Sequence, residues 1–339
     1  MKIIVTGGCG FIGSNFILYW LEKYPQDEIL NLDALTYAGN LTNLKEIEGN
    51  SHYQFVKCDI CNFDLVDSLV KTFKPDCIVN FAAESHNSYA ILNPGIFFKT
   101  NLIGTQTLLE VARKNKVSRL HHISTCEVYG DLDLDSKEKF SEDSPYKPNT
   151  PYNASKASAD LVVRAYWKTF GLPVTISTCA NNYGRFQFPE KLIPLFVSNL
   201  LENKKVPVYK HSQNKREWIH VLDHCRAIDL ILHKGKLGET YNVGTGVEKS
   251  VEEITSAILN YLGKDTSMKE YVEDRPGHDR RYLLNSSKIM VGLGWAPKIN
   301  FEDGLKETVQ WYEENETWWK PLKERKPIEE SSWDGTKNE

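Results

Sequence analysis

Three glycines near the start of the chain constrain its fold more than any other feature. A short apolar stretch, Lys2–Thr6, has the composition of a β-strand and leads into glycines at every third position, Gly7, Gly10 and Gly13. A helix-like segment at 14–24 follows. Such a turn lets backbone amides approach a pyrophosphate, and the helix N-terminus adds positive potential. The pattern therefore predicts a dinucleotide site in an α/β fold.

An acidic residue suited to a ribose stands at the expected distance. A second strand, Glu28–Leu32, ends in Asp33, about 20 positions after the last glycine, where a carboxylate can bind the adenosine ribose hydroxyls. Because the same carboxylate repels a 2′-phosphate, we predict NAD rather than NADP. A third strand, Tyr53–Cys58, ends in Asp59 and Ile60, a position typical of the adenine edge.

Strands and helices alternate through the first half of the chain. Continuous apolar runs at Cys77–Phe81, Arg119–Ser124 and Val174–Cys179 are typical of parallel strands buried on both faces. Helical stretches at 94–114 and 151–170 separate them. This alternation predicts a Rossmann-like, doubly wound parallel sheet of the α/β class.

We expect a second, smaller unit. Residues 1–180 are predicted to form the NAD-binding Rossmann domain, to which 217–244 return, while 181–216 and 245–322 form a mixed α/β lobe that binds the substrate; 323–339 are a polar tail. Asp131–Pro148 reads as a surface loop rather than a substrate lid. The elements predicted for the lobe are helices at Phe188–Asn203, Ser250–Leu262, Ser286–Leu293 and Phe301–Trp319, a strand at Val206–Tyr209 and a charged turn at Lys215–Trp218.

Polar side chains follow the strand that ends at Ser124. Thr125, Cys126 and Glu127 come next, and an open α/β sheet places its chemistry at such strand ends. Glu127 is suited to removing a proton from a carbon beside a ketone. Cys126 is the candidate donor to a departing hydroxyl; the alternative is a small buried filler. Neighbours on a regular strand point apart, so the pair requires a turn.

Tyr152 and Lys156 share one face of the predicted helix 151–170. A nearby ammonium, together with the positive charge of a nicotinamide, should lower the pKa of the tyrosine from about 10. The phenolate could then take the proton of a sugar hydroxyl while hydride leaves to NAD, and Thr125 could share the hydrogen bond. Ala82 and Ala83 leave room for a cofactor after the strand at 77–81.

Composition excludes several other classes of function. The chain has 339 residues and a net charge of −4, with basic residues scattered, so neither nucleic acid nor a membrane surface is a predicted partner. No apolar run reaches the roughly 20 residues that span a bilayer. Seven irregularly spaced cysteines, without a signal peptide, predict a cytoplasmic protein. Neither Cys58 with Cys61 nor His211, His220 and His224 suggest a metal site.

These motifs together resemble the extended short-chain dehydrogenase/reductase family that acts on nucleotide sugars. Within it the chain is similar to the dTDP-glucose 4,6-dehydratases, over almost its full length to about residue 322. The matching stretches are Gly7–Ser14, Leu32–Asn40, Phe81–His86, Pro151–Ala157, Asn181–Gly184, Phe188–Pro194, Pro207–Tyr209 and Asp274–Tyr282. The last four of these separate this branch from epimerases and decarboxylases.

The resemblance implies a tightly held NAD, hydride removal from sugar C4, loss of water across C5–C6, and hydride return to C6. It also implies a homodimer built on the 94–114 and 151–170 helices. The predicted cofactor-binding residues are Gly7, Gly10, Phe11, Ile12, Gly13, Asp33, Ala34, Leu35, Thr36, Asp59, Ile60, Phe81, Ala82, Ala83, Thr100, Tyr152, Lys156 and Asn182. The predicted substrate-binding residues are Ser85, Thr125, Asn181, Lys191, Leu192, Pro207, Tyr209, Arg216, Arg275 and His278.

Four positions depart from the family pattern. Cys126 stands where the family has Asp, so the usual acid is missing, and a protonated thiol or a water must replace it. The stretch 85–90 lacks the family's Asp-Arg pair, Arg185 replaces a proline, and a substrate-contacting Asn is replaced near Ser250. A thiol at 126 also removes a like charge beside Glu127, which should keep that base ionised.

The leading hypothesis is therefore a dTDP-glucose 4,6-dehydratase. The alternatives are a nucleotide-sugar 5,6-dehydratase or epimerase of the same family and, from another class, a non-catalytic NAD-binding scaffold. An epimerase does not need Glu127 as a base at C5, and the intact Tyr152, Lys156 and Thr125 argue against a scaffold.

Overall fold

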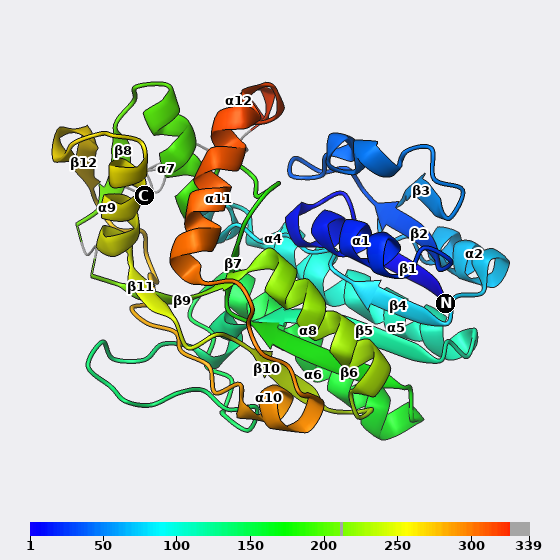
Figure 1. Cartoon of the computed structure of the whole chain (residues 1–339). Coiled ribbons are helices and arrows are strands. Elements are labelled where there is room, and N and C mark those ends of the chain that lie inside the picture. The colour runs from blue at the N-terminus through cyan, green and yellow to red at the C-terminus, as the bar shows by residue number, and fades with distance from the viewer. Residues whose placement is uncertain (211–212, 326–339) are drawn as a thin grey trace.

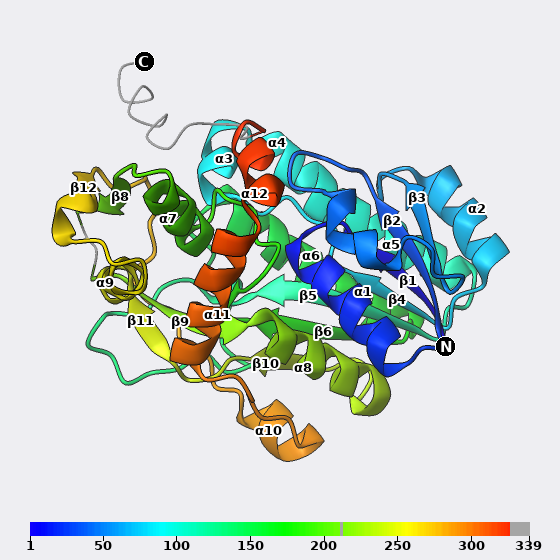
Figure 2. The ribbon, with the colours of Figure 1, turned by 45° about the horizontal axis from the view of Figure 1, so that its top comes forward.

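The structure is a computed structural model that describes residues 1–210 and 213–325. His211 and the tail from residue 326 lie outside the described residues. A seven-stranded parallel sheet forms the centre, and its carboxyl edge points toward a smaller lobe (Figures 1 and 2). In spatial order the strands are β10 (Thr240–Val243), β6 (Val174–Cys179), β5 (Arg119–Thr125), β4 (Cys77–Asn80), β1 (Lys2–Thr6), β2 (Glu28–Asp33) and β3 (Tyr53–Lys57).

Both faces of this sheet are covered by helices, as the predicted doubly wound class requires. Successive side chains of a strand point to opposite faces, and β1 shows this directly. Ile3 and Val5 pack with α1 and α8, whereas Ile4 packs with the helices of the other face. The first layer is α1 (Phe11–Lys23) and α8 (Val221–Lys234), and the second is α2 (Phe63–Phe73), α5 (Thr105–Lys114) and α6 (Pro151–Phe170).

Short helical segments join the strands near the site. The predicted helix at 94–114 is continuous, but its centre widens into a π-helical turn that contains Asn101. The Asn101 amide donates to the carbonyl of Glu84 and to the hydroxyl of Ser155, so it ties this helix to α6.

The short helical segments near the site are η1 (Leu41–Ile47), α3 (Asn87–Leu92), α4 (Pro94–Phe97), the π-helical turn η2 (Phe98–Gly104) and η3 (Cys126–Tyr129).

The smaller lobe has its own core, in which Trp218, Phe301, Tyr312 and Trp319 are buried. A three-stranded sheet consists of β11 (Glu248–Ser250), β9 (Lys215–His220) and β7 (Asn181–Tyr183), and a two-stranded sheet of β12 (Lys269–Val272) and β8 (Val206–Tyr209). The helices are α7 (Leu192–Leu201), α9 (Val251–Tyr261), η4 (Thr266–Met268), α10 (Ser287–Leu293), α11 (Phe301–Glu314) and α12 (Glu316–Lys323); α10 packs on β10.

Three expectations for the lobe were wrong. Residues 215–218 are not a turn but the first part of β9, where the buried Glu217 carboxylate accepts backbone N–H groups from Gly246 and Leu284. The predicted helix at 188–203 begins only at Leu192, since Pro189 follows Phe188 and disfavours helical backbone there. The predicted helix at 301–319 is two helices, separated at Asn315.

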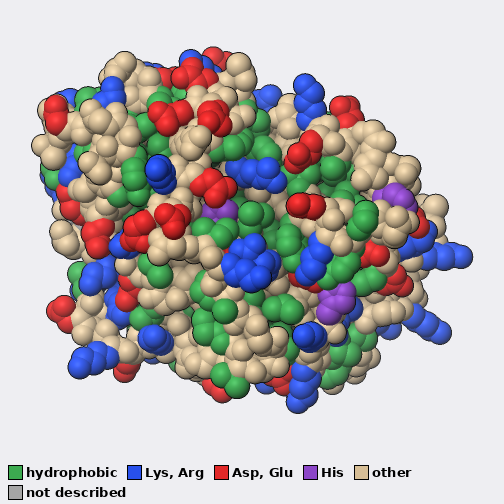
Figure 3. All heavy atoms as spheres, in the orientation of Figure 1, with side chains coloured by type: hydrophobic (Ala, Val, Ile, Leu, Met, Phe, Trp, Pro, Cys, Tyr) green, Lys and Arg blue, Asp and Glu red, His purple; other side chains and the backbone are tan. Residues whose placement is uncertain are grey.

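The chain returns to the main sheet later than the predicted residue 217. Residues 217–220 belong to β9 in the lobe sheet, whereas α8 packs on α1 and β10 joins the main sheet beside β6. The stretch Asp131–Pro148 has no helix or regular strand. Phe140 forms a β-bridge with Leu284, and the Asp131 carboxylate accepts the backbone N–H groups of Arg280 and Arg281. Among the described residues, no helix is long and apolar enough to cross a lipid bilayer. Basic and acidic side chains are interspersed over the face shown in Figure 3.

Candidate active site

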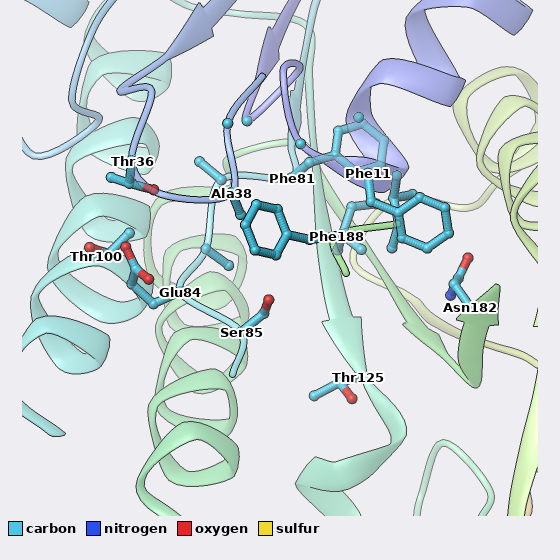
Figure 4. A pocket seen from close by; sticks show the side chains of 18 of the residues that line it. Phe11, Thr36, Ala38, Phe81, Glu84, Ser85, Thr100, Thr125, Asn182 and Phe188 are labelled. Atoms are coloured by element: carbon cyan, nitrogen blue, oxygen red, sulfur yellow. The ribbon is translucent and has the colours of Figure 1, made fainter. Parts of the chain in front are cut away.

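A pocket of about 440 Å³ lies at the carboxyl ends of the main-sheet strands, where the lobe meets the sheet. We call it the central pocket. Its wall is formed by the glycine turn after β1, the ends of β2 to β6, one face of α6, and residues of the lobe between 181 and 193. Figure 4 shows Thr125 at the end of a strand, with Glu84, Ser85 and Thr100 on one side and Asn182 on the other.

The structure gathers nearly all predicted cofactor residues in this pocket. The exception is Leu35, which has a positive φ of 52° and packs against the core beneath β2. The predicted residues that line the pocket are Gly7, Gly10, Phe11, Ile12, Gly13, Asp33, Ala34, Thr36, Asp59, Ile60, Phe81, Ala82, Ala83, Thr100, Tyr152, Lys156 and Asn182.

The glycine turn has the geometry that a pyrophosphate needs. Gly7 has a φ of 70°, and a Cβ at that position would lie 2.6 Å from the backbone nitrogen of Ala82. A Cβ on Gly13 would lie 2.4 Å from the carbonyl oxygen of Gly7. Helix α1 starts at Phe11 without a capping side chain, so its first-turn N–H groups are left for a ligand. The residues present therefore fit a bound dinucleotide.

Asp33 is fixed at the pocket wall by two backbone groups. Its carboxylate accepts the N–H of Cys9 at 2.9 Å and the N–H of Leu35 at 2.8 Å. Burial raises the pKa of Asp33, and these two hydrogen bonds partly counter that effect. A carboxylate has about four acceptor positions, so capacity for two ribose hydroxyls is left.

Tyr152, Thr125 and Lys156 form a buried group beside the end of β5. Thr125 donates to the Tyr152 phenol, and Lys156 Nζ donates to the carbonyl of Ile123 at 2.6 Å. The expected lowering of the tyrosine pKa is not seen: burial and the charge of Glu127 raise the pKa of Tyr152 well above its usual value. Burial also lowers the pKa of Lys156.

Asp160 is a buried carboxylate near Lys156 that we did not predict from the sequence. Asp160 accepts a hydrogen bond from Ser124 Oγ at 2.6 Å, and its Oδ1 lies 3.5 Å from Nε2 of the buried His122. Burial raises the pKa of Asp160 to about 6, and its charge favours the ammonium form of Lys156. Its spacing of four residues from Lys156 on one helix face is the signal in the sequence that could have found it.

Glu127 lines the central pocket and is held by one polar side chain. Asn87 Nδ2 donates to Glu127 Oε2 at 2.8 Å. Burial, followed by the charge of Asp279, raises the pKa of Glu127, while the Asn87 hydrogen bond and the cations Arg275 and Arg216 act in the opposite direction. A buried carboxylate with a raised pKa and one side-chain hydrogen-bond partner has the environment of a general base.

The turn required by a Cys126–Glu127 pair is present, because 126–129 form the 3₁₀ helix η3. Cys126 nevertheless does not line the pocket. Its side chain is 1% exposed and packs with residues such as Val128, Ala157 and Cys179. Burial raises the pKa of this thiol well above its usual value, so it is protonated but shielded from the pocket.

The predicted substrate residues divide into two groups. Ser85, Thr125, Asn181, Lys191 and Leu192 line the central pocket. Pro207, Tyr209, Arg216, Arg275 and His278 do not line it and lie on the lobe around the loop at 274–281.

This lobe group is held together by its own contacts. The Tyr209 ring lies 5.2 Å from the His278 ring, and Arg216 donates to the carbonyl of Asp279 at 2.6 Å. Arg275 Nη1 is buried and has no hydrogen-bond partner among the described residues. Arg216 and Arg275 both lower the pKa of Glu127, so their charges reach the central pocket. Pro207, in contrast, pairs with Glu270 in the β8–β12 ladder.

Several residues in the pocket wall or in contact with it were not predicted from the sequence. Tyr37 donates to Glu190 at 2.8 Å, and burial together with the charge of Glu190 raises the pKa of Glu84. Trp218 Nε1 and Gln187 Oε1 are buried in the wall without partners among the described residues. Glu84, Gln187 and Glu190 stand within or beside the stretches matched to the family, which is the signal that could have indicated them.

Among residues 1–210 and 213–325, no three His, Cys, Asp or Glu side chains come close enough to hold a metal ion. His220 caps α8, and His224 Nδ1 lies 3.0 Å from Asn182 Oδ1. Burial lowers the pKa of His220 to about 4 and that of His224 to about 3, so both are neutral at pH 7.

A sheet in this strand order, with a glycine turn after β1 and a Tyr-x-x-x-Lys helix beside β5, belongs to the extended short-chain dehydrogenase/reductase class. The chain matches the family described as GDP-mannose 4,6 dehydratase over residues 4–308. It is 47% identical over 327 residues to the dTDP-glucose 4,6-dehydratase of Streptomyces niveus, covering 95% of this chain and 96% of that protein. The chain belongs to the dTDP-glucose 4,6-dehydratase family.

Solved structures agree with this assignment. The dTDP-glucose 4,6-dehydratase of Bacillus anthracis, crystallised with NAD, is 51% identical and superimposes with a TM-score of 0.89, covering 95% of this chain and 99% of that one. The dTDP-glucose 4,6-dehydratase DesIV of Streptomyces venezuelae, solved with NAD and TYD bound, is 48% identical with a TM-score of 0.92, covering 95% and 100%. The predicted Rossmann-like fold is confirmed.

Proposed function

We propose that this chain is an NAD-dependent dTDP-glucose 4,6-dehydratase, a hydro-lyase that forms dTDP-4-keto-6-deoxy-glucose. One observation carries the proposal: Glu127 lines the same pocket as the glycine turn and Tyr152. A base that can remove a proton from a sugar carbon therefore lies beside a site for hydride transfer. The names of the relatives and of the solved structures support dTDP-glucose as the substrate and NAD as the cofactor.

The glycine turn would hold the pyrophosphate, Asp33 the adenosine ribose, and Asp59 with Ile60 the adenine edge. Bound NAD supplies a hydride acceptor for sugar C4 and a hydride donor for C6. Phe81, Ala82 and Ala83 follow β4 and line the wall along which the dinucleotide would lie. Lys156 would contact the nicotinamide ribose from α6.

Tyr152 is proposed to take the proton of the C4 hydroxyl as that carbon is oxidised. The positive charges of Lys156 and the nicotinamide ring would offset the burial that raises the pKa of the free phenol. Thr125 donates to the phenol oxygen and would further favour the phenolate.

Glu127 is proposed to act on the ketone that this oxidation produces. The C5 proton becomes acidic beside a C4 ketone, and the carboxylate can remove it as the C6 hydroxyl departs as water. The protonated Glu127 then returns a proton to C5 when C6 is reduced, so that the base is regenerated within the turnover.

The departing hydroxyl needs a proton, and Cys126 and water are the two candidate donors. We favour water, because the Cys126 side chain is buried outside the pocket wall and a thiol is a weak hydrogen-bond donor. Proton balance then requires that Tyr152 lose its proton to solvent before the next turnover.

The lobe is proposed to bind the nucleotide and the diphosphate. Arg216 and Arg275 supply two guanidinium groups, which suit phosphate oxygens, and Tyr209 and His278 form a ring pair for the base. Ser85, Asn181, Lys191 and Leu192 would contact the sugar side of the ligand. This division supports a substrate lobe distinct from the Rossmann domain, although α10, which was assigned to the lobe, packs on α8 and β10 of that domain.

A homodimer is the proposed assembly. Four large apolar side chains on the 94–114 stretch and α6 are exposed: Phe98 at 36%, Ile103 at 51%, Leu161 at 58% and Phe170 at 54%. Light scattering should give twice the 38.8 kDa chain mass, and Leu161→Glu should give the chain mass. A parent protein at the chain mass would contradict the dimer. The cytoplasm is the proposed compartment, supported by seven cysteines without a disulfide among them.

Purified protein incubated with dTDP-glucose and, separately, UDP-glucose tests the function. Loss of one water with a new C6 methyl in the product NMR spectrum is the expected result with dTDP-glucose. A vinylic C6 would favour a 5,6-dehydratase, inversion at C4 without water loss an epimerase, and no turnover of either nucleotide sugar a non-catalytic scaffold.

A further inference from the structure

Asn87 makes two side-chain hydrogen bonds that join the proposed base to the catalytic helix. Its Nδ2 donates to Glu127 Oε2 at 2.8 Å, and its Oδ1 accepts from Thr150 Oγ1 at 2.7 Å. Thr150 is the N-cap of α6, where its Oγ1 accepts the N–H of Asn153 at 3.2 Å. Both ends of the Asn87 amide are thereby fixed.

The three elements involved are far apart in the sequence. Asn87 begins α3, Glu127 lies in η3 after β5, and Thr150 precedes the helix that presents Tyr152 and Lys156. Because the amide can neither flip nor rotate without losing a bond, it fixes Glu127 relative to Tyr152. Among the described residues, the Glu127 carboxylate accepts a side-chain hydrogen bond from Asn87 alone.

We propose that Asn87 is a positioning residue that aims the Glu127 carboxylate at sugar C5 and couples it to the N-cap of the Tyr152 helix. The inference rests on the proposed function and deepens it, since it assigns the control of the elimination step. Asn87 does not line the central pocket, so it acts through Glu127 rather than on the sugar.

The charges around Glu127 explain why this bond matters. Asp279 faces it from the loop at 274–281 and opposes ionisation, while Arg275 and Arg216 favour it from that loop and from β9. Lys191 also favours the carboxylate, from the lobe. Tyr152, Tyr282, Cys126 and Cys179 interact with it as well, but burial raises the pKa of each, so they add no charge at pH 7 in the free protein. Asp279 is itself held by Asn149 and Asn153 at the start of α6. Asn87 is thus the neutral donor that stabilises the carboxylate directly.

Asn87→Leu removes the donor while keeping the side-chain size. Loss of a hydrogen bond to a charged group predicts a fall in the elimination rate of roughly 10- to 100-fold, with C4 oxidation in a single turnover unchanged. Loss of the donor also raises the pKa of Glu127. The acid limb of the kcat–pH profile, where activity is lost as the base becomes protonated, should therefore move to higher pH. Deuterium uptake at C5 from D₂O reports the base directly.

Asn87→Asp removes the N–H donor to Glu127 but keeps an oxygen that can accept from Thr150. It also places a second carboxylate against Glu127, so the acid limb should move further toward high pH than in Asn87→Leu. Thr150→Ser, which keeps the hydroxyl, should behave as the parent. Thr150→Val should move the acid limb in the same direction by a smaller amount, and it provides the test if the Asn87 variants do not fold.

Asn93→Leu is the matched control, because it makes the same change at the exposed far end of α3. Unchanged pH profiles for Asn87→Leu, or equal slowing of oxidation and elimination, would overturn the proposal and leave Asn87 a structural residue. The carboxyl pKa of Glu127, followed by difference infrared titration against Glu127→Gln, gives a readout without turnover. If the parent does not convert dTDP-glucose, the proposed function fails, and this pKa shift still decides the role of Asn87.

Discussion

The two walls of the central pocket are built differently. The sheet wall presents Tyr152, Lys156 and Glu127 from a long helix and a strand end, where burial shifts the pKa of each group. The lobe on the other side carries permanently charged guanidinium groups, Arg216 and Arg275, on a short strand and a loop; they do not line the pocket, but their charges reach it. Proton transfer needs tuned, fixed groups, whereas phosphate binding needs donors that stay charged at any physiological pH.

This difference predicts a separation of kinetic effects. Changes on the sheet wall should lower kcat, since they act on groups that serve the reacting atoms. Changes on the lobe wall should raise KM, since they act on parts of the ligand that do not react. The predictions that follow probe this separation, beginning with the largest effect.

Tyr152→Phe should abolish most activity. Removing the phenol removes the acceptor for the C4 hydroxyl proton, and a loss of roughly 10²- to 10⁴-fold in C4 oxidation is expected. Rapid-scan absorbance of reduced NAD in a single turnover measures this step. Tyr166→Phe makes the same change later in α6 and should leave the rate unaltered. Equal oxidation rates in Tyr152→Phe and the parent would remove the phenol from the mechanism.

Arg275→Gln should raise the KM for dTDP-glucose, and the inhibition constant of dTDP, by roughly 10- to 100-fold, the value of a lost hydrogen bond to a charged group. The native fold loses little, because Nη1 has no partner among the described residues. Steady-state kinetics should show kcat nearly constant. A matching fall in kcat would place this guanidinium with the reacting atoms and break the separation of the two walls.

Asp160→Asn should slow C4 oxidation roughly tenfold at pH 7, because loss of the carboxylate lowers the pKa of Lys156 further. The carboxylate favours the charged lysine, so its loss leaves less ammonium to stabilise the phenolate. Raising the pH further deprotonates Lys156, and the basic limb of the profile should therefore begin at lower pH in the variant. An unshifted basic limb would show that Asp160 is only structural.

Cys126→Ala should have the smallest catalytic effect. A buried thiol outside the pocket wall predicts an elimination rate close to that of the parent and a loss of stability of about 1 kcal/mol, typical of a core truncation. The ratio of elimination to oxidation rates is the quantity to measure. A large, selective fall in elimination would instead make the thiol the proton donor, and water would be excluded.

The sheet wall could be predicted from sequence because its signals are local. The glycine spacing, Asp33 and the Tyr152–Lys156 pair each sit at the end or on the face of an element that its own residues define. The helix at 151–170 has the bounds predicted for it, since Thr150 caps its start and Gly171 ends it within one short stretch.

The lobe wall and the hydrogen-bond links were harder to predict because they depend on distant segments. The charged residues of Lys215–Trp218 predict a solvent-exposed turn. Glu217 can be buried because its carboxylate accepts backbone N–H groups from Gly246 and Leu284, which are distant in the sequence. The link from Asn87 to Glu127 spans 40 residues, and no periodicity encodes it. The sequence shows the lysine beside Tyr152 but not the burial, and burial is what raises the pKa of the free phenol.

The central claim is that one pocket removes a hydride from C4 of the sugar and returns it to C6 of the same molecule. dTDP-glucose labelled with deuterium at C4, converted in ordinary water, tests this most directly. The account predicts that NMR finds the deuterium in the C6 methyl of a 4-keto product, with hydrogen from solvent at C5. Deuterium that remains at C4, or that is absent from C6 in a product that has lost water, would contradict it.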